Sequence, residues 1–499
     1  MKKWLNIWLT SALAILMIAT VARNEPISLP LKDTKMSWSY YPEGSPKGLV
    51  GIASPVISYQ INIKGADDDY QLQMLLNGKK VKASYDPKTG LLTYKPNKLS
   101  GKQTVNVQLI VYEEKALDIS WNFTVDTKTI NPFLEKDMNV LSTVQEEAVQ
   151  QINSYRTTLK LNTISKNPVL QKSSQAHSNY LAAQGDSGHD EFFGVPGFTG
   201  ENPWNRAAYF GYLGTVGEGI TYKKVSGHSG IVDLMDAPYH RLSIIDPFVE
   251  EAGVGFNKQG DIVVNYGNPT LMDKPSQIVL YPHNGQNNVK NSWFVAETPN
   301  PLRFYQLSDI FVGYPISYAY FSKNKNDQLI VEKVSLTNVA GKAVPFYPVT
   351  PSIDDHGQHH VFIIPKAPLQ PGTKYKAVVS AKVKTENGTK DVSKIWTFTT
   401  AGKLAIKDIY FIKHDRVNFI QVDTLSGDDP NQIVTIEKNG KKYLENRHHQ
   451  QVTYKTITPG TYVLKINSPL FKEVKKYTIT ISKNTAKRMQ NDGDWVVKW

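Results

Sequence analysis

The stretch that decides the fold is NPVLQKSSQAHSNYLAAQG, residues 167–185. Asn167 is a suitable helix N-cap, and Pro168 suits the first helical turn, where a missing N–H costs nothing. Gly185 is a typical residue at which a helix ends. Residues at helical spacing form one stripe of the segment: Leu170, Ser174, His177 and Leu181. The pattern predicts a helix with the ring of His177 pointing inward.

The rest of residues 138–270 mixes helical and extended patterns. A preceding helix is indicated by apolar or aromatic residues at helical spacing: Val144, Ala148, Ile152, Tyr155 and Leu159. A later helix is expected around 231–235, stopped by Pro238. Residues 253–256 and 262–266 are typical of a strand pair around a turn at 258–260. This segment is therefore predicted to be an α+β domain.

The remaining segments have β character. Alternating apolar and polar residues favour all-β, Ig-like sandwiches of seven-strand type at 26–126 and 274–400, with a linker at 127–137. A smaller basic sandwich is expected at 401–499. The related stretches LQPGTKY (369–375) and ITPGTY (457–462) each place a tyrosine after a turn. Such tyrosines often bond back to the corner backbone of a sandwich.

The amino-acid composition narrows the classes of site and of partner that the protein can have. The 499 residues predict about three to five domains. The absence of cysteine excludes disulfides, cysteine–zinc and iron–sulfur sites, and a thiol nucleophile. The net charge of +12 is modest for this length, so no nucleic-acid partner is expected. Residues 403–499 hold 17 Lys and Arg against 10 Asp and Glu, or +7. Contact with an anionic cell-wall polymer and a merely soluble surface both suit this charge.

The N-terminus is typical of an exported protein. Lys2 and Lys3 precede an apolar run, and small residues follow it, so residues 1–22 are predicted to be a signal peptide. An uncleaved anchor is the alternative, since the run approaches spanning length. No second long apolar stretch occurs. A secreted or cell-surface protein without a stable transmembrane domain after cleavage is expected.

Residues that suit catalysis or metal binding are most frequent in 138–270, which contains four of the 11 histidines. With the helix placing His177 inward, a buried pair of His177 and His240 with Glu218 suits three roles. It suits a divalent metal site, general acid–base chemistry, or a hydrogen-bonded polar core. The residues alone leave these roles open.

Six short motifs in this order carry a resemblance: AHSNY (176–180), GH (188–189), PWNR with GY (203–206, 211–212), GEGI (217–220), APYHR (237–241) and GVG (253–255). Together they resemble a bacterial member of the CAP superfamily, which comprises cysteine-rich secretory, antigen 5 and pathogenesis-related 1 proteins. The resemblance implies an α–β–α sandwich, here embedded among the Ig-like domains. It implies a cavity lined by His177, Glu218 and His240, with zinc often held by the histidine pair.

The sequence departs from the family pattern at several positions. The usual Gly-Glu-Asn is Gly217-Glu218-Gly219, and a second cavity glutamate has no clear match. Glu191, close to His189, and Asp233 are the candidates to replace it. These departures weaken the prediction of a hydrolase more than they weaken the prediction of the fold.

Three functions follow as hypotheses. The first is a binding protein whose cavity holds a divalent metal, a small lipid or a peptide. The second is a metal-assisted hydrolase of peptide or cell-wall substrate, with Glu218 as general base. The third is a structural or adhesive wall protein without chemistry.

Overall fold

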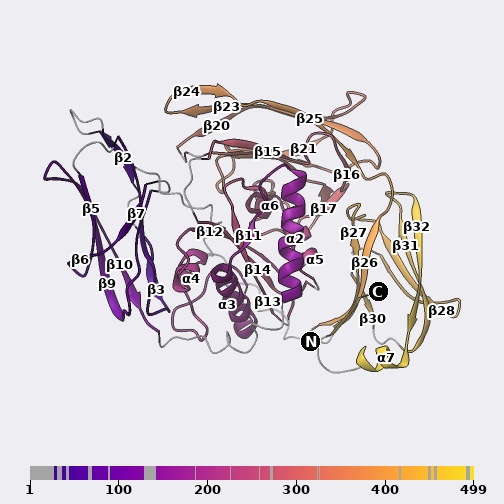
Figure 1. Cartoon of the computed structure of the whole chain (residues 1–499). Coiled ribbons are helices and arrows are strands. Elements are labelled where there is room, and N and C mark those ends of the chain that lie inside the picture. The colour runs from indigo at the N-terminus through magenta and orange to yellow at the C-terminus, as the bar shows by residue number, and fades with distance from the viewer. Residues whose placement is uncertain are drawn as a thin grey trace, which may run out of the picture.

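The computed structural model describes residues 27–30, 36–40, 44–65, 70–87, 90–127, 142–185, 187–224, 226–257, 259–269, 274–322, 324, 326–414, 417–447, 451–454, 458–489 and 495–498. The predicted signal peptide and nearly all of the predicted linker lie outside these residues. The predicted class is confirmed: one α–β–α unit lies among all-β modules (Figure 1). No helix within the described ranges is both long and apolar enough to cross a bilayer.

The first module is a sandwich of two five-stranded sheets, ordered β1-β2-β4-β8-β7 and β3-β10-β9-β5-β6. Its strands are β1 (Ile27–Pro30), β2 (Ser37–Tyr40), β3 (Gly48–Val50), β4 (Ile57–Lys64), β5 (Tyr70–Leu76), β6 (Lys79–Val81), β7 (Ser84–Asp86), β8 (Leu91–Tyr94), β9 (Gly101–Val111) and β10 (Glu114–Val125). Alternate residues of β9 and β10 fill the space between the sheets. The expectation of seven strands is too low, because short edge strands such as β6 and β7 extend both sheets.

The central domain has three layers. A four-stranded sheet, ordered β11-β13-β14-β12, has helix α3 on one face and helices α2, α5 and α6 on the other (Figure 1). The helices are α2 (Ser142–Thr158), α3 (Pro168–Gln184), α4 (Pro203–Tyr209), α5 (Gly227–Asp236) and α6 (Pro238–Ile245). The strands are β11 (Ser165–Lys166), β12 (Thr215–Thr221), β13 (Glu251–Phe256) and β14 (Ile262–Asn268).

Helix α3 begins and ends as its sequence predicts. The side chain of Asn167 accepts hydrogen bonds from the backbone N–H groups of Val169 and Leu170, at 2.8 and 3.1 Å. Gly185 ends the helix with φ at 63°, in the left-handed region that favours glycine. Helix α5 ends just before Pro238, as predicted, and Pro238 also opens α6, which was not predicted.

The GVG motif sets how closely α3 packs on the sheet. A Cβ added at Gly253 or Gly255 would lie 2.0 or 2.2 Å from backbone atoms of the helix. Only glycine therefore permits this approach. Because α3 carries His177, the two glycines also fix how far that ring extends beyond the sheet.

The third module is a second sandwich. Its sheets are ordered β15-β19-β22-β21 and β16-β25-β23-β20, with β24 beside β23 and a separate pair β17-β18. The strands are β15 (Gln277–Tyr281), β16 (Gln286–Val289), β17 (Ser292–Phe294), β18 (Phe311–Gly313), β19 (Ile316–Phe321), β20 (Gln328–Asn338), β21 (Phe346–Val349), β22 (His360–Pro365), β23 (Lys374–Thr385), β24 (Gly388–Asp391) and β25 (Lys394–Thr400). A 3-10 helix, η1 (Arg303–Tyr305), precedes β18.

The fourth module pairs a sheet ordered β30-β27-β26-β33 with one ordered β29-β28-β31-β32. Its elements are β26 (Ile406–His414), β27 (Val417–Thr424), β28 (Ile433–Lys438), β29 (Lys441–Arg447), β30 (Gln451–Tyr454), β31 (Gly460–Ser468), β32 (Glu473–Ile481), α7 (Lys483–Met489) and β33 (Trp495–Lys498).

Both predicted tyrosine corners are confirmed. The hydroxyl of Tyr375 accepts a bond from the backbone N–H of Gln370 at 2.9 Å, and that of Tyr462 donates to the carbonyl of Thr458 at 2.8 Å.

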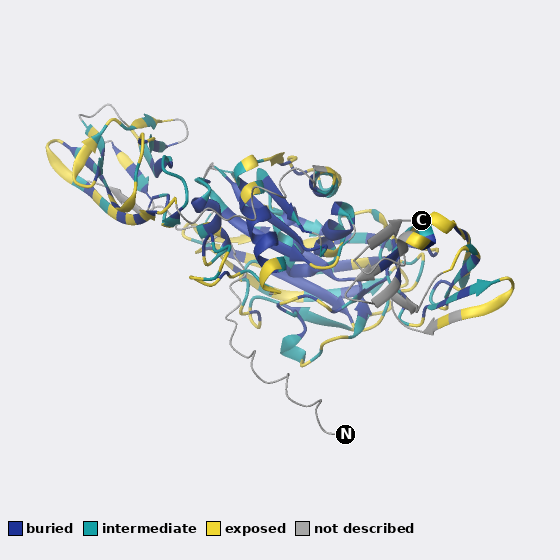
Figure 2. Cartoon of the chain, turned by 90° about the horizontal axis from the view of Figure 1, so that it is seen from below, coloured by how far each residue is buried: buried dark blue, intermediate teal, exposed yellow. Residues whose placement is uncertain are grey.

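The central domain and the third module share one hydrophobic core. The cluster that begins at Ala148 on α2 continues without interruption to Phe398 on β25. Arg241 of α6 is buried in the third module, where its guanidinium lies 4.8 Å from the ring of Tyr281 and donates to the carbonyl of Pro315 at 2.8 Å. Buried segments accordingly concentrate in the middle of the molecule (Figure 2).

Candidate functional site

Glu218 is the centre of a buried polar network in the central domain. It lies on β12 directly opposite Asn265 of β14, whose Nδ2 donates to Oε2 at 2.8 Å. Arg206 of α4 donates through Nη2 to both carboxylate oxygens, at 2.8 and 2.9 Å. The same guanidinium donates through Nη1 to the carbonyl of His189 at 2.7 Å. One arginine thus holds both the carboxylate and the loop beside it.

Two histidines lie beside this carboxylate. Nδ1 of His189 is 3.0 Å from Oε1 of Glu218, and Nε2 of His177 is 3.8 Å from the same oxygen. Burial by itself raises the pKa of the Glu218 carboxyl. The guanidinium of Arg206, and after it the rings of His177 and His189, outweigh burial and hold that pKa well below its usual range. Glu218 is therefore a firmly ionised group.

The ring of His177 is fully buried and engaged at both nitrogens. Nδ1 lies 3.0 Å from Oε1 of Glu191, and Nε2 lies 3.0 Å from the carbonyl oxygen of Gly188. Both partners are acceptor oxygens, so each ring nitrogen already faces a protein group. A metal needs a nitrogen lone pair, so His177 in this arrangement does not fit a metal ligand.

Glu191 completes the buried network. Its carboxylate accepts from the backbone N–H of Thr199 at 2.6 Å and from the hydroxyl of that residue at 3.2 Å. These bonds tie the 188–201 loop to helix α3 through His177. Among the predicted residues, the structure therefore brings together His177, Glu191, His189 and Glu218, but it gives His240 other partners.

A cavity of about 700 Å³ borders this network at His189. Its walls come from three modules. The central domain supplies His189, Phe192, Asp233 and His240; the third module supplies Lys290, Trp293 and Glu297; the fourth supplies Lys407, Asp423 and Leu425. His177, Glu191 and Glu218 are not among the lining residues. The helical periodicity thus predicts correctly that the ring of His177 points inward. The ring points into the core, however, and not into the cavity.

His240 reaches this cavity from α6 and is held by the third module. Its Nδ1 lies 2.8 Å from Oε1 of Glu297, and its backbone N–H donates to the same oxygen at 2.9 Å. His189 is held in the same way by Glu218. A carboxylate on Nδ1 fixes the tautomer that leaves the lone pair on Nε2, which is the usual support of a metal-binding histidine. By this chemistry each of the two histidines, His189 and His240, has the carboxylate support of a metal-binding histidine.

Three important residues were not singled out from the sequence. Arg206 stands inside the quoted PWNR motif, so its motif was visible while its role was not. Asn265 becomes visible only through the register of β12 and β14. Glu297 belongs to another module and carries no local signal that would link it to His240.

An aromatic loop borders the cavity. The side chain of Phe193 is 87% exposed and that of Phe192 is 60% exposed, and Phe192 lines the cavity. The ring of Phe193 packs edge-on against Phe198, with centroids 5.6 Å apart. The loop therefore forms a lip and does not pack down as part of a core.

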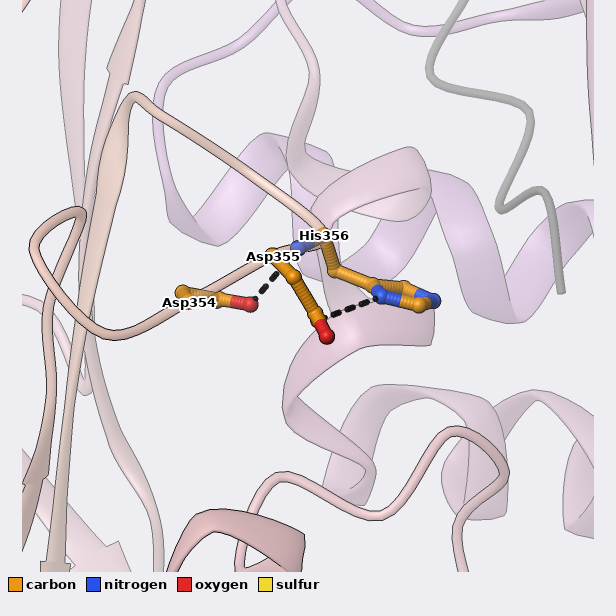
Figure 3. Close-up of side chains that lie close together, drawn as sticks. All are labelled: Asp354, Asp355 and His356. Atoms are coloured by element: carbon orange, nitrogen blue, oxygen red, sulfur yellow. Dashed lines mark hydrogen bonds and ion pairs between the residues drawn. The ribbon is translucent and has the colours of Figure 1, made fainter. Parts of the chain in front are cut away.

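A second cluster lies in the third module, where Asp354, Asp355 and His356 are grouped closely enough to suggest a cation site (Figure 3). The carboxylate of Asp354, however, accepts from Tyr239, from the backbone N–H of His356, and from Nε2 of His360. The guanidinium of Arg303 also lies against both aspartates. The guanidinium and these hydrogen bonds already engage both carboxylates, so we assign the cluster to fastening the third module to α6 and not to holding a cation.

Comparisons with known proteins agree with this architecture. The family model described as the cysteine-rich secretory protein family, CAP, matches residues 149–266, and a model of a bacterial Ig-like domain matches residues 318–400. No curated protein matches the chain.

Similar solved structures include an extracellular protein containing an SCP domain from Bacillus anthracis, with 13% identity over 49% of this chain and 88% of that chain, and a TM-score of 0.21. A cysteine-rich secretory protein from Staphylococcus aureus has 10% identity over 49% and 89%, with a TM-score of 0.20. An outer surface protein from Borrelia burgdorferi has 18% identity over 24% and 90%, with a TM-score of 0.22. Through residues 149–266, the chain carries a CAP domain of the cysteine-rich secretory protein family, joined to a bacterial Ig-like domain.

Proposed function

We propose that this protein works outside the cell as a binding protein, with its ligand in the cavity shared by the CAP domain and the two following modules. The observation that carries the proposal is that three modules together line one cavity of about 700 Å³. That volume lies in the range of small-molecule sites. The extracellular nature of CAP proteins and the predicted signal peptide support the location.

We further propose that the cavity holds a divalent metal such as zinc. His189 and His240 are the residues that would hold it, in place of the predicted pair His177 and His240, because both ring nitrogens of His177 face protein oxygens in the core and His177 does not line the cavity. The metal would supply a Lewis acid that binds an oxygen of the ligand.

The network that borders the cavity favours binding over hydrolysis. A general base works best when its pKa lies near the working pH, and Glu218 is held far below it by Arg206. We therefore assign Glu218 a positioning role, in which it orients His189. A purely structural or adhesive protein is the outcome to be expected if neither metal nor small ligand binds.

Metal binding is tested by isothermal titration of the full chain with zinc. We expect the double variant His189→Ala, His240→Ala to lose at least tenfold in affinity, and His283→Ala, a change in the third module away from the cavity, to match the unmodified chain. Unchanged uptake by the double variant would refute the metal assignment.

Ligand binding is tested separately with benzyl alcohol, a small neutral probe that needs no metal. Ala296 is an exposed residue of the cavity wall. Ala296→Trp therefore adds a large side chain to the cavity without placing an indole ring in the core. We expect this variant to bind the probe more weakly than the unmodified chain. If the unmodified chain binds neither benzyl alcohol nor its charged analogue benzylamine, the proposed cavity function fails.

A further inference from the structure

We propose that the cavity selects an organic cation: an ammonium group on an apolar body, with the ammonium seated against Glu297. This inference rests on the proposed function and names the class of its ligand. It depends on a residue that the third module contributes, and not on the CAP domain alone.

The two oxygens of Glu297 differ in their partners. Oε1 accepts from the backbone N–H and from Nδ1 of His240, at 2.9 and 2.8 Å. Oε2 is buried and has no hydrogen-bond partner among the residues that the structure describes. The side chain as a whole is fully buried, although the residue lines the cavity. A buried carboxylate oxygen without a donor is costly, so a ligand that brings a donor removes a penalty that the free protein carries.

The lining residues have an excess of negative charge. Three lysines line the cavity, against six carboxylates. The carboxylates are those of Asp190, Asp233, Asp236, Glu297, Asp423 and Asp428. With the histidines neutral, the formal balance is −3. A concave surface of one sign concentrates ligands of the opposite sign, so this cavity attracts cations.

The lysines of the cavity do not offer an anion site. Lys224 forms an ion pair with Asp233, and Lys290 forms one with Asp236. Lys407 lies 4.0 Å from the carboxylate of Asp408. Each ammonium group already has an acidic neighbour, so an anionic ligand would have to break an ion pair to bind.

The apolar part of the cavity lining indicates the second part of the ligand, which is an apolar body. Trp293 and Phe294 of β17 and Phe192 of the lip all line the cavity. Aromatic faces bind apolar groups and attract cations through their electron density. An ammonium beside a hydrocarbon or aromatic body, such as an amine-bearing peptide side chain, therefore matches both the carboxylate and the rings.

The test is a series of probes that share a benzyl body and differ in charge. The full chain is titrated calorimetrically at pH 7.5 and low salt, with EDTA present so that no metal contributes. We expect benzylamine, as its ammonium form, to bind at least tenfold more tightly than benzyl alcohol, and benzoate to show no measurable binding. Equal affinity for the amine and the alcohol, or preference for benzoate, overturns this inference but leaves the cavity function. Absence of binding by every probe overturns both.

A matched pair of variants locates the charge. Glu297→Gln keeps an acceptor for His240 and removes the negative charge, so we expect at least a tenfold loss for benzylamine and less than a twofold change for benzyl alcohol. Glu332→Gln is the control: Glu332 is an exposed glutamate on β20 of the same module, paired with Lys382. Unchanged benzylamine affinity in a folded Glu297→Gln chain overturns the assignment to Glu297. If that variant does not fold, the probe series on the unmodified chain decides the charge selectivity alone.

Discussion

The hydroxyl of Tyr239 donates a hydrogen bond to Oδ1 of Asp354 at 2.9 Å, although Tyr239 belongs to the CAP domain and Asp354 to the third module. The bond lies in a buried interface, where Tyr239 also packs edge-on against Phe362 with centroids 5.1 Å apart. The residue that precedes the cavity histidine His240 is thus part of the seam between the two modules.

This seam gives the first prediction. Tyr239→Phe keeps the ring but removes the donor to a buried carboxylate, so we expect the free energy of unfolding to fall by about 1–2 kcal/mol. Urea unfolding of the full chain, followed by tryptophan fluorescence, measures it. Tyr112→Phe, at an exposed position of the first module, should have little effect. Equal effects of the two changes would show that the Tyr239–Asp354 bond does not stabilise the seam.

The second prediction concerns Arg206 and Glu218. Arg206→Met leaves the Glu218 carboxylate buried without its cation, and we expect a loss of about 3–5 kcal/mol in the free energy of unfolding. Adding Glu218→Gln to that variant removes the uncompensated charge, so the double variant should lose less than the sum of the two single changes. Additive losses in a urea-unfolding double-mutant cycle would contradict the coupling.

The third prediction is a dependence of stability on pH. The pKa of Glu218 is lower in the folded chain than the value of about 4.3 for an unfolded glutamate. Such a group stabilises the folded state above the unfolded pKa, and this contribution is lost as the pH falls through and below that value. Below about pH 5 the unmodified chain should therefore lose stability more steeply than Glu218→Gln, by up to about 1.4 kcal/mol per pH unit.

The measurement for this prediction is a set of urea-unfolding curves between pH 6 and pH 3.5. Glu332→Gln, which removes an exposed carboxylate, should retain the steep slope of the unmodified chain. Parallel slopes for the unmodified chain and Glu218→Gln would show that the carboxyl is not held ionised by folding.

The fourth prediction tests contact of the basic fourth module with an anionic wall polymer. Four exposed lysines of this module are changed to glutamine: Lys441, Lys442, Lys472 and Lys476. We expect weaker binding to immobilised teichoic acid, and a smaller loss of binding on adding salt, because fewer charges are then screened. The matched control changes four exposed lysines of the first module: Lys79, Lys80, Lys98 and Lys102. Equal loss in both variants would mean that net charge, and not the fourth module, drives the contact.

Local signals explain what the sequence predicts well. The cap at Asn167, the glycine at 185 and the tyrosine corners at Tyr375 and Tyr462 depend on residues within a few positions of one another. Such interactions form wherever the backbone takes the same local path. For this reason the helices, the strand pair and the sandwich corners are predictable without any knowledge of the whole fold.

The site depends on contacts between distant residues, and there the sequence is less informative. Helical periodicity states that His177 faces inward, but it does not distinguish the core from a cavity. His189 lies in a loop with no periodicity, and Arg206 reaches it only because α4 packs beside β12. Glu297 stands 57 positions from its partner His240 and in a different module, so only the packing of the modules brings them together.

The continuous core between α2 and β25 has a consequence for how such chains evolve and are dissected. The family match ends at residue 266, yet part of the apolar surface of α6 is covered by β19, which comes after it. A fragment that stops at the end of the match would present that surface to water and tend to aggregate. We therefore expect the CAP domain and the third module to fold as one unit, so recombination that replaced one without the other would have to rebuild the seam.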